Sequence, residues 1–331
     1  MDIPVQNKID SYCDSYLALK KSLRWKSSGL YIRLCALAYA FEDRRADAEA
    51  LLDAIGYIKK NTRWYSVLRA SRVYSAAYLT AGRKNIESEF PRLANCYDVM
   101  KKAGFGSSAY LSIAAYALYS TTPAGSEQAK AERAKLIHEA MKTQHPFLTS
   151  ADDYASSVIL ASVDRPVDDL VNEVERTYQL LRSSGFHSGN GTQLLSQILA
   201  FDPASPEEKA ERCKMIFDRL KQNKNRVSSM YYGTIGFLAL TGKAWEQSTE
   251  QALDAIEAMK KKNCHGFGEK EFSLMIASAL VCKCSLDDNE PSGTTLLRIG
   301  LGATVEAIIA AQTAACVAAA AAASAASSAS S

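Results

Sequence analysis

The sequence is poor in histidine and lacks the glycine-rich motifs that hold nucleotide phosphates. Its four histidines, at positions 138, 145, 187 and 265, are far apart and carry no local signature of a Ser/His/Asp or Cys/His nucleophilic set. Neither a Walker motif nor a dinucleotide-binding motif is present, so no cofactor is predicted. Motifs alone therefore predict no catalytic residue.

An excess of one charge is also missing. The chain has 39 basic and 36 acidic residues, a formal net charge of +3. The longest basic run, residues 260–262, lies beside Asp254 and Glu257 in a helical pattern, which is typical of a solvated helix face. No nucleic-acid partner is predicted.

The cysteines do not form a disulfide framework, because eight of them are scattered over 331 residues. Five fall in apolar helical windows, where we expect reduced thiols that pack as small hydrophobes: Cys13, Cys35, Cys96, Cys213 and Cys316. Residues 1–8 lack the charged-then-apolar order of a signal peptide. A cytoplasmic protein is expected.

A zinc site would need Cys264 and His265 to meet Cys282 and Cys284 around one ion. A helix over 269–283 would separate the two pairs by about 20 Å, at 1.5 Å per residue. No metal site is predicted.

Strand patterns are nearly absent, whereas apolar residues recur at spacings of three and four, as in helices. Residues 96–105 and 177–186 both place Tyr, an apolar pair, a basic residue and Gly-Phe in the same order. This predicts a helix that ends at glycine, an aromatic that fills the junction, and a serine (Ser107 or Ser188) that begins the next helix.

Internal repeats follow from this junction. Bulky residues stand about 40 residues apart along the chain, at Trp25, Trp64, Phe105, Phe147, Phe186, Val227 and Phe267. Thirteen residues after each, an apolar pair ends at Ala38, Ala77, Leu118, Leu160, Leu199, Leu240 and Leu280. About half of these positions would be polar by chance, so we predict an all-α helical-repeat solenoid of about seven helix–loop–helix units.

The solenoid is predicted to cover residues 1–290, followed by a linker at 291–302 and an Ala-rich helix with a frayed Ser-rich end at 303–331. The units form either an open array or one curved toward an α/α toroid. The favoured role of the last helix is to cap the final unit. Homo-oligomerisation through its small residues is the second interpretation. A membrane span is the least favoured, because Glu306 and Gln312 interrupt the apolar stretch.

Two neighbouring segments hold the candidate site residues. Asp152 and Asp153 follow Thr149-Ser150, which is also the pattern of a capped helix start, and this structural interpretation is favoured. Asn190, Gln193 and Gln197 share one helix face, and His187 precedes it. Amides on a concave surface could bind a peptide backbone, although a solvated face is the simpler expectation.

Three segments resemble an uncharacterised, all-helical bacterial family of about this length: residues 145–153, 178–186 and 193–199, together with the Ala/Ser-rich end. The resemblance covers most of the chain and implies no activity. The leading hypothesis is a non-enzymatic scaffold that binds a protein or peptide. The alternative is an enzyme with a deep cleft between the fourth and fifth units, in which Asp152, Asp153 and His187 converge.

Overall fold

The computed structural model describes residues 1–24, 27–64, 66–265 and 270–288, and all regular secondary structure in these ranges is helical. The predicted all-α class is confirmed. The expected linker at 291–302 and helix at 303–331 lie outside the described residues, as do Trp25 and Phe267.

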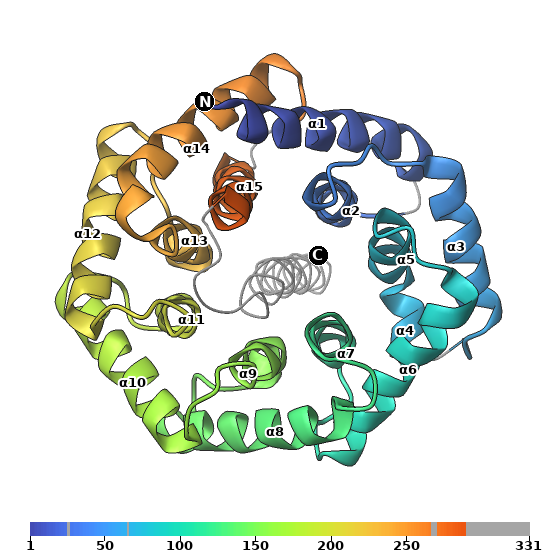
Figure 1. Ribbon diagram of the computed structural model, residues 1–331, viewed down its shortest axis with the longest axis horizontal. Helices are drawn as coiled ribbons and strands as arrows, with labels where there is room; N and C mark the ends of the chain where they lie inside the picture. Colours follow the sequence, from blue (N-terminus) through green and yellow to red (C-terminus); the bar gives the residue numbers. More distant parts are fainter. Residues whose placement is uncertain (25–26, 65, 266–269, 289–331) are drawn as a thin grey trace, which may run out of the picture.

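The helices form two layers around a common axis, as Figure 1 shows. Long helices make the outer layer: α1 (Ile3–Leu23), α3 (Ala48–Lys60), α6 (Ile86–Lys102), α8 (Glu127–Gln144), α10 (Val167–Ser183), α12 (Pro206–Gln222) and α14 (Trp245–Lys261). Mostly shorter helices make the inner layer: α2 (Gly29–Phe41), α4 (Val67–Ala70) with α5 (Arg72–Ala81), α7 (Ala109–Thr121), α9 (Tyr154–Leu160), α11 (Asn190–Leu199), α13 (Gly233–Ala239) and α15 (Lys270–Asp288). Short 3-10 turns precede α9 (η1, Ala151–Asp153), α13 (η2, Ser229–Tyr231) and α14 (η3, Gly242–Ala244).

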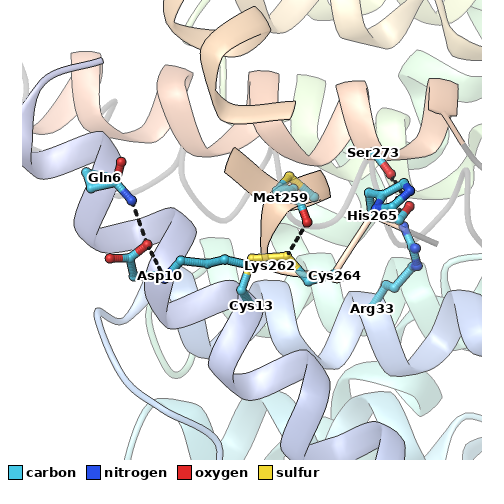
Figure 2. Close-up of a disulfide and its surroundings, with 9 residues drawn as sticks. All are labelled: Gln6, Asp10, Cys13, Arg33, Met259, Lys262, Cys264, His265 and Ser273. Atoms are coloured by element: carbon cyan, nitrogen blue, oxygen red, sulfur yellow. Dashed lines mark hydrogen bonds and ion pairs between the residues drawn. A yellow bond between two sulfur atoms is a disulfide. The ribbon is translucent and has the colours of Figure 1, made fainter. Parts of the chain in front are cut away.

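The two layers close into a ring. Helix α1 packs against α14 and α15, and α15 packs against α2. At this closure a disulfide joins Cys13 in α1 to Cys264, just after the end of α14, with Cα atoms 5.3 Å apart (Figure 2). The expectation of a reduced Cys13 is therefore wrong. Cys13 and Cys264 are 251 residues apart and are brought together by the ring closure, which local sequence patterns do not reveal.

The apolar pairs found in the sequence form the core of the inner layer. All of them are buried apart from Leu240, which is half-buried. Full burial of a leucine or isoleucine side chain contributes about 1.5–3 kcal/mol. Glycine permits closer packing where α11 meets α13: a Cβ at Gly236 would lie 2.9 Å from Ile198 Cγ2.

Neighbouring inner helices run parallel. Lys130 Nζ donates to Thr121 O, at the end of α7, and to Ser162 Oγ, just past α9. Arg212 likewise pairs with Asp202, just past α11, and donates to Ala239 O in α13 at 3.0 Å. These cations lie where the helix dipoles are negative, and each holds two inner-helix C-termini together on one face of the ring.

The N-termini of the inner helices meet on the other face. Gly106 N, before α7, donates to Tyr154 Oη in α9 at 3.3 Å. Ser228 Oγ, before η2 and α13, donates to Glu271 in α15 at 3.0 Å. The segments that leave the outer helices therefore all lie on this face.

Two of these junctions have the predicted geometry. Gly104 and Gly185 have φ of 93° and 97°, the left-handed conformation that ends a helix. The following Phe105 and Phe186 are buried, and their N–H groups bond to the helix carbonyls of Met100 and Leu181.

Other expectations for the junctions are wrong. Trp64 and Phe147 are 83% and 98% exposed, so they do not fill a junction as Phe105 does. After α8 the chain turns through a bond from Thr149 N to His145 O, and Thr149 takes the buried place. Ser108, not Ser107, caps α7. Gly189, not Ser188, is the N-cap residue of α11, which has no side-chain cap.

Candidate functional site

Amide side chains of α11 reach back to the segment that begins α9. Asn190 Nδ2 donates to Asp152 Oδ2 at 3.0 Å, and Gln197 Nε2 donates to Asp153 Oδ1 at 3.0 Å. Between them, Gln193 Nε2 donates to Thr149 Oγ1 at 2.8 Å. One helix face thus connects the fourth and fifth pairs of helices.

This face is only partly solvated. Gln193 and Gln197 are each 2% exposed, so the expectation of a solvated surface is wrong for them. Their amides are covered because they point into the contact with η1, α9 and α8, where Gln197 also lies 3.6 Å from Met141 Sδ. Asn190 is exposed and Asp152 is half-buried, so these two residues form the part that a ligand could reach.

Asp153 lies inside the contact and is 8% exposed. Its carboxylate also accepts from Ser150 N at 3.0 Å, which makes the capping arrangement of a helix start at η1. Burial raises the pKa of Asp153 to about 7, with a further contribution from the nearby Asp152 charge, while the bonds from Gln197 and Ser150 oppose the rise.

His187 does not join the two carboxylates. Its side chain is exposed, and its main chain makes the described contacts: His187 N donates to Tyr232 Oη at 3.4 Å, and its carbonyl accepts from Thr192 Oγ1 at 2.6 Å. Among the described contacts none links the imidazole of His187 to Asp152 or Asp153. The structure thus brings together five of the six predicted residues and leaves this imidazole outside.

A buried histidine that the sequence did not single out supports the same region. His138 in α8 has Nε2 3.1 Å from Ser150 O, and its ring packs against Tyr154 and Phe105. Because the carbonyl of Ser150 can only accept, Nε2 of His138 donates this bond, and burial lowers the pKa of His138. In the sequence, His138 could be recognised only by its position on the apolar face of α8. An ordinary core residue has the same pattern.

The cavities beside these residues are small. One of about 10 Å³ is lined by Gln193, Ser196, Met141, Tyr178 and their neighbours. That volume suits about one water molecule and no substrate. A larger one, about 60 Å³, lies apart from the site between α2, α4, α5 and α7, and Tyr31, Ser71 and Ser112 supply its polar lining.

The described residues contain no cluster of three or more histidine, cysteine or acidic side chains arranged to hold a metal. Of the cysteines considered for zinc, Cys264 forms the disulfide, while Cys282 and Cys284 are buried in α15. Within the same ranges no helix is both long enough and apolar enough to cross a membrane.

Comparison with known proteins gives a family and no activity. A family described as "protein of unknown function (DUF4003)" matches residues 15–314. The uncharacterised protein YeaA of Bacillus subtilis (strain 168) is 25% identical over 316 residues, which cover 94% of this chain and 93% of that protein. No solved structure matches.

Proposed function

We propose that this chain, which belongs to the DUF4003 family of proteins of unknown function, is a non-enzymatic helical-repeat scaffold that binds a protein or peptide. Support for the repeat comes from the junctions at Gly104 and Gly185 and from the buried apolar pairs about 40 residues apart. Arrays of this kind present long surfaces built from equivalent helices.

The single observation that carries the proposal is the linked pair Asn190–Asp152 at the start of two neighbouring inner helices. Asn190 uses one amide hydrogen on Asp152 and keeps a second hydrogen and its carbonyl oxygen. Asp152 has carboxylate lone pairs that can accept a peptide N–H. The pair therefore offers a donor and acceptors side by side, which an extended backbone requires.

Buried partners hold this pair in place. Gln197 and Asp153 connect α11 to η1 one residue beyond Asp152, and Gln193 adds a bond to Thr149. A surface that is already ordered loses less conformational entropy on binding.

The proposal is tested by selecting peptides from a displayed library on the immobilised protein and measuring their affinity by fluorescence anisotropy. Asn190→Ala is expected to weaken the selected peptides about tenfold, since one or two hydrogen bonds are lost. Asn172→Ala, on the outer helix α10, serves as the control because it also removes an exposed asparagine. Failure to enrich any peptide, or equal losses in both variants, would refute this site.

A second candidate function rests on the raised pKa of Asp153, about 7, which suits a general acid or base near neutral pH. An enzyme would need His187 to turn toward Asp153, and a cleft to open there. Screening hydrolytic substrates with the wild type and Asp153→Asn tests this alternative. Turnover that Asp153→Asn abolishes would favour the enzyme over the scaffold.

A further inference from the structure

Basic residues gather on one face of the ring. We define the basic face as the last turn of each outer helix and the segment that joins it to the next inner helix, at 20–24, 27–28, 57–64, 66, 99–108, 141–153, 180–189, 219–232 and 258–265. These residues include 17 Lys and Arg and two acidic residues, Asp152 and the buried Asp153. The parallel inner helices place all of these segments on the same side.

The opposite face has the reverse balance. It consists of the segments that end the inner helices and begin the outer ones: 1–6, 42–51, 82–89, 122–130, 161–170, 200–209 and 240–248. They hold 15 Asp and Glu against 8 Lys and Arg. A nearly neutral protein therefore has a strong charge asymmetry along the ring axis, and its positive side would attract an anionic partner.

Helix stability explains part of this asymmetry, because cations at helix C-termini interact favourably with the helix dipole. Arg219, Lys260 and Lys262 also form ion pairs with nearby carboxylates, which reduces their availability. Lys59, Lys60, Lys101 and Lys102 are exposed on adjoining outer helices and are better placed to meet a partner.

Helix stability does not explain the apolar side chains on the same face. Phe147 and Trp64 are almost fully exposed, and Met230 is 48% exposed. They follow α8, α3 and α12, which Figure 1 places well apart around the ring. A partner that covers all three must therefore be broad and flat, whereas a single-stranded nucleic acid would follow one continuous path.

We propose that the basic face docks on a membrane surface rich in anionic lipids. Lysine and arginine would lie at the headgroups, and Phe147, Trp64 and Met230 would enter the boundary of the acyl chains, as in other peripheral proteins. No helix needs to cross the bilayer for this attachment. Asn190 and Asp152 lie on the same face, but the inference goes beyond the proposed peptide site because it concerns a membrane surface and rests on the lysine, arginine and exposed apolar side chains.

Sedimentation with phosphatidylcholine vesicles, with and without phosphatidylglycerol, tests the proposal. The wild type is expected to bind the anionic vesicles and to dissociate at high salt. The double variant Lys59→Glu/Lys60→Glu is expected to bind at least about 25-fold more weakly, since each lysine near an anionic surface contributes about fivefold and the new carboxylates add repulsion. Phe147→Ser is expected to bind about tenfold more weakly, from lost apolar burial.

A matched control separates the face from the net charge. Arg83→Glu/Lys243→Glu makes the same charge change at exposed residues of the opposite face. This control, like Asn190→Ala, is expected to retain vesicle binding. Equal losses in the two double variants, no preference for anionic vesicles, or binding to single-stranded RNA without binding to vesicles would overturn the proposal.

Discussion

Gln197 Nε2 lies 3.0 Å from Asp153 Oδ1, and both side chains are buried between the fourth and fifth pairs of helices. Gln197 Oε1 has no hydrogen-bond partner among the described residues. A rotated Gln197 amide would let this oxygen accept from a protonated Asp153. The pair can therefore accommodate both protonation states of the carboxyl group.

The first prediction concerns the pH dependence of stability. A pKa of about 7 for Asp153, against about 3.9 in the unfolded chain, means that the folded protein binds more protons between these values. The free energy of unfolding should fall as the pH rises from about 4 to about 7. Above about pH 7, Asp153 should cause no further change in it. In Asp153→Asn the decrease in this pH range should be smaller by a few kcal/mol, which is the free energy that corresponds to the pKa difference.

Urea unfolding at several pH values measures the effect. Asp164→Asn, at an exposed position, is the control and should keep the wild-type profile. Identical profiles for wild type and Asp153→Asn would show that this carboxyl group titrates normally.

The disulfide at the ring closure should stabilise the fold. Cys13→Ser removes a crosslink that spans 251 residues, and we expect the free energy of unfolding to drop by about 2–4 kcal/mol. Dithiothreitol should lower the urea midpoint of the wild type and leave that of Cys13→Ser unchanged. A wild type that is insensitive to dithiothreitol would contradict this role.

Two glycines should respond to alanine in opposite directions. Gly185 has φ of 97° and open space where a methyl group would be added, so Gly185→Ala should cost about 1–2 kcal/mol through backbone strain alone. Gly56 lies inside α3 with similar space, so Gly56→Ala should stabilise by about 0.5–1 kcal/mol. Thermal melts of both variants provide the comparison, and shifts of the same sign would refute the strain argument.

The buried Lys209 should need the partly exposed Glu173 as its counter-charge. Lys209 is fully buried in α12 and lies 2.6 Å from Glu173 in α10, which Arg165 also contacts. Burial opposes ionisation of Glu173, but the bonds from Lys209 and Arg165 outweigh it and lower its pKa. Glu173→Gln leaves the buried ammonium without a counter-charge, at a cost of about 3–5 kcal/mol.

Lys209→Met should cost less, because Glu173 keeps Arg165 and the methionine fills the space. Chemical denaturation of both variants distinguishes the two effects. Equal costs would mean that packing, rather than charge, decides the contact.

Local patterns predicted the helical class and the turns at Gly104 and Gly185, because each depends on a short stretch of sequence, and the recurrence of the apolar pairs indicated which residues are buried. They did not predict that Thr149 would be buried in place of Phe147, since this depends on how the turn after α8 packs. The cluster of Asp153, Gln193 and Gln197 was indicated by spacing, but its burial follows from the contact between helix pairs.

The basic face was hidden for a related reason. In the sequence, lysine pairs such as Lys59-Lys60 and Lys101-Lys102 stand about 40 residues apart and appear as separate helix ends. Only the parallel order of the inner helices gathers them. The net charge of the whole chain does not show this asymmetry, because basic and acidic residues nearly balance over the full sequence.

The meeting of α1 with α14 and α15 also constrains how such a protein can change in size. An unclosed stack can gain or lose a hairpin at its end while every remaining contact stays as it was. A closed ring cannot gain a hairpin in this way, because one more hairpin would change the angle between all adjacent helix pairs at once. The number of hairpins in this protein is therefore fixed by geometry, and variation during evolution should be confined to side chains and connecting turns.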